Sequence, residues 1–270
     1  MNTKAASSSG TLAGLVVHVL SLQSRSALIW GASLGLYAAA LVASFTAFDP
    51  VQMDRMMQAY PEGMLEAFGI TDMASPEGFL AGQVFNLAPV ALAFFPILAC
   101  AGMLAGAEER GTMDVLLGNP IPRWQLVAGG FLATALSLLG IVGVMGVIMY
   151  GTAVLMDVDL SIEASANAIL NLWPTCAFFG GLALLCSAIF HRKALAVALP
   201  AVVLFAMYLV DALGRVSADL EELRPASIFY YYGSAIEDGI DWASFGGTIA
   251  VTFACVLLAM LAFRRRDIYT

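Results

Sequence analysis

Charged side chains are scarce in this sequence. Only 12% of its 270 residues are Asp, Glu, Lys or Arg, whereas 60% are hydrophobic, and the mean hydropathy is +0.85. A soluble domain carries about twice that share of charge. Because so few charges cannot cover the apolar surface of a water-soluble fold, we expect much of the surface to face lipid.

Charge is missing altogether from six long stretches of the chain. Each is near or above the ~20 residues that cross a bilayer as a helix, with about 17 as the lower limit. Strands would need the weaker alternating pattern of a barrel. The sequence therefore predicts an all-α polytopic membrane protein, one transmembrane domain over 1–270, with spans at 27–48, 78–107, 124–156, 164–190, 194–210 and 243–263.

Several kinds of chemistry lack the residues that they need. There is no G-x-x-x-x-G-K-[ST] motif, so the chain cannot bind the phosphates of ATP by itself, and active transport would draw its energy from a partner. No ionisable residue falls within a predicted span, which argues against ion coupling, although Asp157, Glu163 or Asp211 at a span end could serve. The four cysteines form no CxxC pair. We expect no catalytic residue, metal site or cofactor in this chain.

Basic residues are unevenly divided between the two sides that six spans define. Both termini fall on one side, which holds nine of the twelve Lys and Arg residues, and the positive-inside rule places that side in the cytoplasm. The other side holds sixteen of the twenty acidic residues. An acidic exterior does not favour nucleic acid as a partner. We therefore expect a multi-pass protein of the plasma membrane with both termini cytoplasmic.

The segments between the spans predict smaller elements. Residues 11–24 are typical of an amphipathic helix on the inner membrane face, with the alternative that this helix is continuous with the first span. The outer loop 49–77 predicts a small helical cap, and Ser75-Pro76-Glu77 predicts the start of the second span. The outer loop 211–241 is too long for a simple turn, and its aromatic residues suit the outer headgroup region.

The inner connection 108–123 combines charge with amphipathicity. Thr112 can cap a short helix in which Met113, Leu116 and Leu117 share one face, and Gly118-Asn119-Pro120 ends it. Charged residues flank this helix on both sides. A short amphipathic helix at the cytoplasmic surface is a place where a soluble partner can deliver energy.

The exact amino-acid sequence of this connection says more about function than its amphipathic pattern does. Glu108 to Trp124 runs E-E-R-G-T-M-D-V-L-L-G-N-P-I-P-R-W, which resembles the signature E-E-R-G-T-x-[DE]-x-L-L-x-x-P-[VI]-x-R of type-2 ABC transporter permeases. Three further segments are similar to the subgroup of antibiotic and multidrug exporters: 76–80, 229–242 and 263–268. The resemblance covers essentially the whole chain.

The resemblance implies a fold, partners and site residues. The fold is an interfacial elbow helix, six spans and an outer helical element between spans five and six. Two permeases, here expected to be identical copies, pair with two copies of a cytoplasmic ABC ATPase, which binds ATP and Mg²⁺. The helix after the second span docks on the ATPase, and by matching position its coupling residues are Glu108, Glu109, Arg110, Gly111, Thr112, Asp114, Leu116, Leu117, Pro120 and Arg123. We expect the ATPase, when it closes on ATP, to push on this helix and also on the Arg192-Lys193 turn.

The expected function is outward transport of a lipophilic substrate, such as a drug, an antibiotic or a lipid-like molecule. The spans offer apolar walls and no charged site. Export of copper or sodium remains an alternative. Thioethers bind soft ions such as Cu(I), and the outer loop contains Met53, Met56, Met57, Met64 and Met73. A membrane scaffold or sensor subunit that transports nothing is a further alternative.

Overall fold

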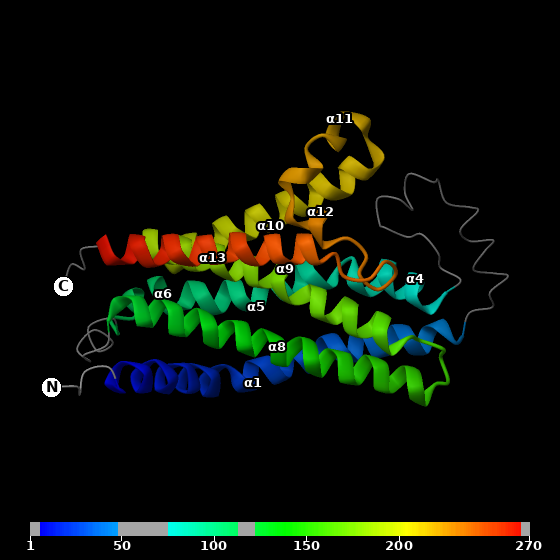
Figure 1. Cartoon of the computed structure of the whole chain (residues 1–270), viewed down its shortest axis with the longest axis horizontal. Helices are drawn as coiled ribbons and strands as arrows, with labels where there is room; N and C mark the ends of the chain where they lie inside the picture. Colours follow the sequence, from blue (N-terminus) through cyan, green and yellow to red (C-terminus); the bar gives the residue numbers. More distant parts are fainter. Residues whose placement is uncertain (1–5, 48–74, 113–121, 266–270) are drawn as a thin grey trace.

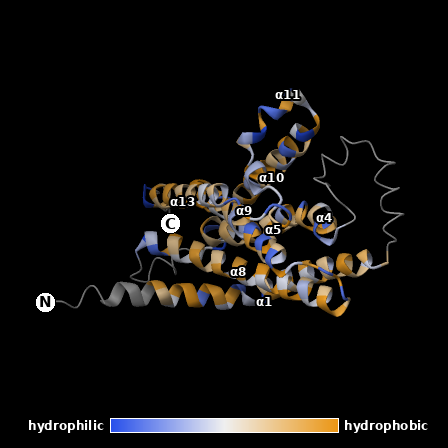
Figure 2. Ribbon diagram, turned by 45° about the vertical axis from the view of Figure 1, so that its right-hand side comes forward, coloured by the Kyte–Doolittle hydropathy of each residue, from blue (hydrophilic) through white to orange (hydrophobic). Residues whose placement is uncertain are grey.

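The computed structural model describes residues 6–47, 75–112 and 122–265, and every regular element within these ranges is helical. Five of these helices are long and apolar enough to cross a membrane, or six if a bent pair of helices counts as one span. The long helices lie alongside one another (Figure 1). The start of α1 (Ala6–Phe45), the end of α13 (Trp242–Arg265) and helix α6 (Ala105–Glu109) gather at one end of the bundle (Figure 1). Apolar residues dominate the long helices (Figure 2).

Helix α1 runs without a break from Ala6 to Phe45. The expectation of a separate elbow helix over 11–24 was therefore wrong, and the alternative of a continuous helix is confirmed. The stretch between the two expected helices contains no Gly or Pro, and the hydroxyls of Ser21 and Ser24 donate to carbonyls three residues earlier, at 2.7 and 2.8 Å. At 1.5 Å per residue, 40 residues extend about 60 Å, which is longer than the hydrocarbon core.

Helix α9 (Ile162–Ile189) forms the centre of the bundle. It packs against α5, α8 (Arg123–Leu155), α10 (Lys193–Val216) and α13 (Trp242–Arg265). Its most apolar 18-residue window is 78% buried, against 22% in α1, α10 and α13. These four helices thus surround α9, whereas α1 packs mainly against α8. The helices on the outside present apolar side chains outward, as a helix in contact with lipid does.

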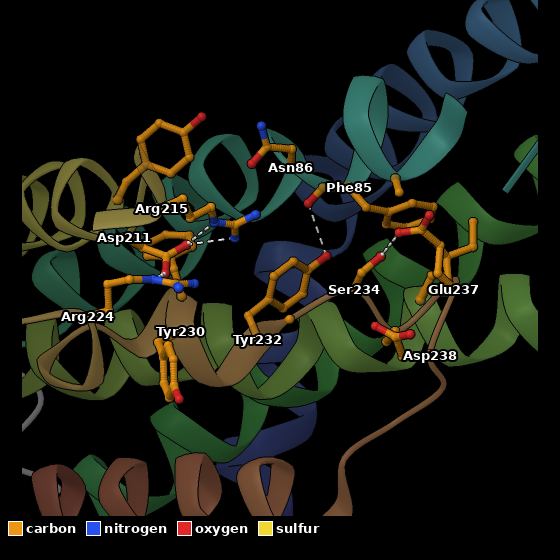
Figure 3. Close-up of a pocket in the computed structure, with 17 residues that line it drawn as sticks. Phe85, Asn86, Asp211, Arg215, Arg224, Tyr230, Tyr232, Ser234, Glu237 and Asp238 are labelled. Carbon is orange, nitrogen blue, oxygen red and sulfur yellow. Dashed lines mark hydrogen bonds and ion pairs between the residues drawn. The ribbon is translucent and has the colours of Figure 1, made fainter. Parts of the chain in front are cut away.

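The second span is broken near the end of the bundle opposite α6, which is called the outer end below, while the end with α6 is called the inner end. It consists of α4 (Pro76–Leu80), a π-helical turn (Ala81–Phe85) and α5 (Ala88–Met103), with a bend of 40° before α5. Pro89 has no N–H to donate to the carbonyl of Phe85 four residues earlier. The hydroxyl of Tyr232 donates to that carbonyl instead, at 3.1 Å (Figure 3). The sequence predicted the start of this span at Ser75, whose hydroxyl caps α4, but not the break.

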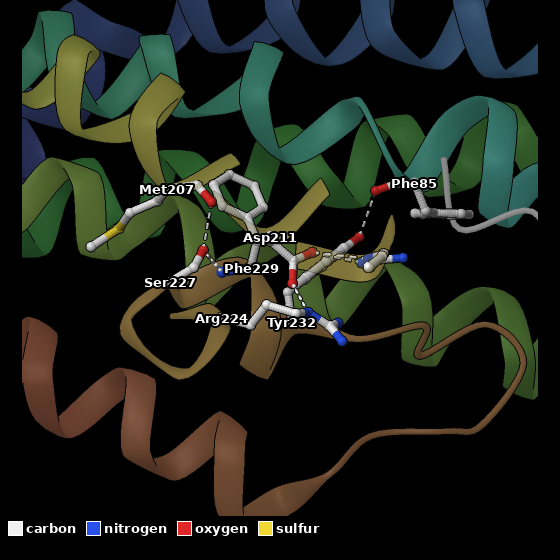
Figure 4. Close-up of polar contacts among 8 residues, drawn as sticks. Phe85, Met207, Asp211, Arg224, Ser227, Phe229 and Tyr232 are labelled. Carbon is white, nitrogen blue, oxygen red and sulfur yellow. Dashed lines mark hydrogen bonds and ion pairs between the residues drawn. The ribbon is translucent and has the colours of Figure 1, made fainter. Parts of the chain in front are cut away.

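An outer helical element lies between α10 and α13. It contains α11 (Ala218–Glu221), a 3₁₀ turn (Arg224–Ala226) and α12 (Ile228–Tyr232), and its α11 portion rises away from the bundle (Figure 1). The hydroxyl of Ser227 donates to the carbonyl of Met207 at 2.8 Å and accepts from the amide of Phe229, which ties α12 to α10 (Figure 4). The predicted cap over 49–77 lies, up to residue 74, outside the described residues, as do all five outer methionines.

Candidate functional site

The candidate site is built on the short helix α6 (Ala105–Glu109), which follows α5 after a break at Leu104. In an unbroken helix the amide of Ala105 would donate to the carbonyl of Ala101. Here the hydroxyl of Ser187, a buried residue of α9, lies between them: it accepts from Ala105 N at 2.9 Å and donates to Ala101 O at 3.1 Å. A side chain inserted in this way kinks a helix. Ser187 therefore separates α6 from α5 and anchors it to α9. The break at Leu104 is the hinge between α5 and α6.

Two carboxylates of α6 reach the turn between α9 and α10. Oε1 of Glu108 lies 2.8 Å from Nδ1 of His191, and Oε1 of Glu109 accepts from the backbone amide of Lys193 at 2.8 Å. Lys193 is the first residue of α10, so Glu109 caps the positive end of that helix. These contacts link the two inner connections to each other, 83 and 84 residues apart in the sequence.

The side chain of Lys193 packs closely on Gly106 of α6. A Cβ atom on Gly106 would lie 3.3 Å from the side chain of Lys193. Helix α6 then ends sharply, because Gly111 has φ +65°, a conformation that other residues rarely adopt. The amide and hydroxyl of Thr112 both donate to the carbonyl of Ala107, at 2.9 and 3.1 Å. The chain thus leaves α6 in a fixed direction.

The predicted coupling residues fall into three groups. The structure brings Glu108, Glu109 and Lys193 together, with the exposed Arg192 beside them and Arg110, Gly111 and Thr112 directly after Glu109. Arg123 belongs to a different contact, at the start of α8, where its guanidinium lies 5.7 Å from the ring centre of Phe263 on α13. The remaining members lie outside the described residues: Asp114, Leu116, Leu117 and Pro120.

Two residues of this site, His191 and Ser187, were not predicted from the sequence. His191 directly precedes the basic pair at 192–193, and a histidine in a charged inner turn was a usable signal for a carboxylate partner. Ser187 gave no such signal, since a serine in an apolar helix most often bonds within its own helix. Its role depends on the packing of α9 against the break at Leu104.

A groove of about 830 Å³ lies beside α6, between α1 and α5. Its walls are mostly apolar, and Arg110 and Thr112 lie at one end. Arg110 also donates to the carbonyl of Gly102 at 3.3 Å, so one side chain borders the groove and spans the hinge at Leu104. The other lining residues used below are Leu22, Trp30, Phe95 and Leu98.

Comparison with known proteins identifies the family of this chain. The model of one family, described as ABC-2 family transporter protein, matches residues 24–268. A search of curated proteins found no match. The matched range covers most of the chain, begins within α1 and includes the hinge at Leu104. The chain therefore belongs to the ABC-2 transporter family, as a membrane-spanning permease that has no ATPase activity of its own.

Proposed function

We propose that this permease belongs to an exporter that moves a lipophilic substrate outward, and that α6 with the α9–α10 turn receives the motion of a separate ATPase. The observation that carries this proposal is the double contact of Glu108 and Glu109 with the turn at His191–Lys193. Two connections that are joined in this way move as one body. The adjacent segment 113–121 lies outside the described residues. We propose that Asp114, Leu116, Leu117 and Pro120 of this segment also contact the ATPase.

The hinge explains how a push at this surface reaches the spans. Helix α6 is connected to α5 through the break at Leu104 and to α9 through Ser187. Because α9 contacts most of the other long helices, a displacement of α6 is passed to the whole bundle. A small shift amplified by packed helices is a known mode of conformational switching.

The groove between α1 and α5 supports the substrate class. Its volume of about 830 Å³ lies within the range of about 300–1,000 Å³ that is usual for ligand pockets, and its walls include Leu22, Trp30, Phe95 and Leu98. Arg110 borders the groove and follows directly after Glu109. A movement of α6 therefore changes the shape of the groove at this end. The ATPase that moves α6 would in this way act directly on the place where the substrate binds.

The orientation and the partners are part of the same proposal. Arg110, Arg192 and Lys193 lie at the end of the bundle that carries the start of α1 and the end of α13, and the positive-inside rule puts that end in the cytoplasm of a plasma-membrane protein. On the resemblance to type-2 permeases, a second identical permease and two ATPase subunits complete the transporter. ATP and Mg²⁺ bind in the ATPase subunits.

The test removes the negative charge of the carboxylate that caps α10 and keeps the shape of the side chain. The permease is co-expressed with an ABC ATPase that co-purifies with it, and the complex is placed in proteoliposomes with a lipophilic dye. We expect Glu109→Gln to lower dye-stimulated ATP hydrolysis and dye transport by about threefold to tenfold, the size of effect that residues along a coupling path have. The matched control is Glu163→Gln, another exposed glutamate near a helix start, at the opposite end of the bundle.

Two results would reject the proposal. If Glu109→Gln transports and hydrolyses as well as the control, the contact does not carry the motion. If the permease assembles with no ATPase at all, the assigned role of this surface is wrong.

A further inference from the structure

The outer end of the bundle contains a small polar cavity that the proposed export mechanism does not use. Its volume is about 220 Å³, the space of about seven water molecules. It lies among α10, α12, the break in the second span and the turn that follows α12 (Figure 3). It is too small for a drug-sized molecule and large enough for a compact polar group.

One wall of the cavity has an excess of positive charge. The carboxylate of Asp211, 4% exposed, is shared by two arginines: Arg215 Nη2 lies 2.7 Å from Oδ2, and Arg224 Nε lies 3.2 Å from Oδ1. One carboxylate cannot neutralise two guanidinium groups. Among the described residues, Asp211 takes only one of the five N–H donors of Arg224. The remaining donors suit an anion with several oxygens, such as a phosphate.

The opposite wall is acidic. Glu237 and Asp238 line the cavity across from the arginines (Figure 3). The hydroxyl of Ser234 donates to Oε2 of Glu237 at 2.7 Å, which fixes the position of that carboxylate. An acidic wall repels a second anion and attracts an ammonium group.

Neutral polar groups lie between the two walls. Asn86 and Tyr208 also line the cavity, and the hydroxyl of Tyr232 is held by the carbonyl of Phe85. A ligand that carried one sign of charge would be attracted at one wall and repelled at the other. A compact zwitterion satisfies both walls at once.

The geometry points to a binding site for a zwitterionic group that joins a phosphate to an ammonium, with the phosphate at Arg215 and Arg224 and the ammonium at Glu237 and Asp238. At the end of a membrane-spanning bundle the source with this chemistry is the headgroup of a phospholipid of the phosphatidylethanolamine type. The inference is independent of the export proposal, since it concerns the other end of the molecule and requires no ATPase.

The test measures binding of defined lipids to the delipidated, detergent-purified chain. The probes are two short-chain lipids with equal acyl chains: dihexanoyl phosphatidylethanolamine, which is zwitterionic, and dihexanoyl phosphatidylglycerol, which is only anionic. We expect the dissociation constant to be about threefold to fivefold lower for the zwitterionic lipid, the preference that a partly exposed charge pair confers. The double variant E237Q/D238N is expected to lose this preference.

The matched control is E221Q/E222Q. It also removes two negative charges, but from exposed residues near α11 that do not line the cavity. It should keep the preference. Soluble glycerophosphoethanolamine separates the two sources of the ligand: binding as tight as that of the lipid identifies a free zwitterion, and much weaker binding identifies a lipid headgroup. The inference is overturned if the unmodified chain does not prefer the zwitterion, or if E237Q/D238N keeps the preference.

Discussion

The two ends of this bundle use charge in opposite ways. At the end with α6, the contacts lie on the surface: the side chain of His191 is 60% exposed and that of its partner Glu108 is 24% exposed. At the other end the carboxylate of Asp211 is buried, with a side chain 5% exposed and two arginines around it. Exposed pairs contribute little to stability and rearrange easily, whereas breaking a buried cluster is costly. The difference suits an end that moves and an end that keeps its shape.

The backbone differs between the ends in the same sense. Near the outer end, the hydroxyls of Tyr37 and Tyr232 donate to the carbonyls of Gln83 and Phe85 in the broken part of the second span. An unsatisfied carbonyl within a membrane is costly, so both tyrosines fix the break in place. At the inner break one serine hydroxyl bridges Ala101 and Ala105, and a straight helix could replace both of its bonds by one. The inner break is therefore the one that can change state.

The largest effect is expected from removal of the buried carboxylate. Asp211→Ala leaves Arg215 and Arg224 facing each other without their shared partner. We expect the free energy of unfolding to fall by about 2–4 kcal/mol, near the lower end for a broken buried pair because both arginines are partly exposed. Thermal unfolding in detergent measures this change.

The control for this prediction is Asp219→Ala, a neighbouring acidic residue on α11 that is exposed. Its effect should stay within about 0.5 kcal/mol, as is usual for surface substitutions. Equal effects for the two variants would remove the distinction between a buried and an exposed charge at the outer end, and with it the contrast between the ends.

The sequence predicted the class of fold and one side of the site for physical reasons. Long charge-free stretches have few alternatives to membrane helices, so helices occur at all six expected places. The pair Glu108-Glu109 was predicted to lie at the inner surface, because charge next to an apolar span marks its end. Neither inference needs to know which helices are neighbours.

The missed features all depend on neighbours. Ser187 and Ala105 are 82 residues apart, and only the packing of α9 against α5 brings them together. The fifth span was expected to end at 210, but α10 continues to Val216. In this extension Asp211 forms ion pairs with Arg215, one helical turn later, and with Arg224, which belongs to the helical element after α10. The partner Arg215 is four residues away and visible in the local sequence, whereas the contact with Arg224 depends on how the segment after α10 folds back.

An intermediate effect is expected from Ser187→Ala. The change removes the hydroxyl that bridges Ala101 and Ala105, but these two backbone groups can then bond to each other if α5 and α6 straighten. We expect a loss of about 1 kcal/mol in the free energy of unfolding, the net value of a typical hydrogen bond. Dye-stimulated ATP hydrolysis by the assembled complex should fall further than this small loss explains, because a straight α6 no longer meets the α9–α10 turn.

The matched control is Ser165→Ala in the same helix. The hydroxyl of Ser165 is buried without a hydrogen-bond partner among the described residues, so its removal should be neutral or stabilising and should leave ATP hydrolysis unchanged. If Ser187→Ala behaves like this control in both measurements, the inner break is not a hinge.

The smallest loss of stability is expected from Asp241→Asn. This variant tests whether burial of a charge or its position at the outer end explains the contrast between the ends. Asp241 lies at the outer end, yet it is exposed, and hydrogen bonds from the Ser244 hydroxyl and the Ala243 amide lower its pKa below the ordinary value of 3.8. Because the folded state favours the carboxylate, the stabilisation is present at neutral pH and is lost as the pH falls through the lowered pKa. The advantage of the unmodified chain over Asp241→Asn, measured by thermal unfolding at pH 7 and again below pH 3.8, should therefore be small and should shrink at the lower pH. An effect as large as that of Asp211→Ala would mean that the outer end is sensitive to any lost charge, so that position rather than burial makes it rigid.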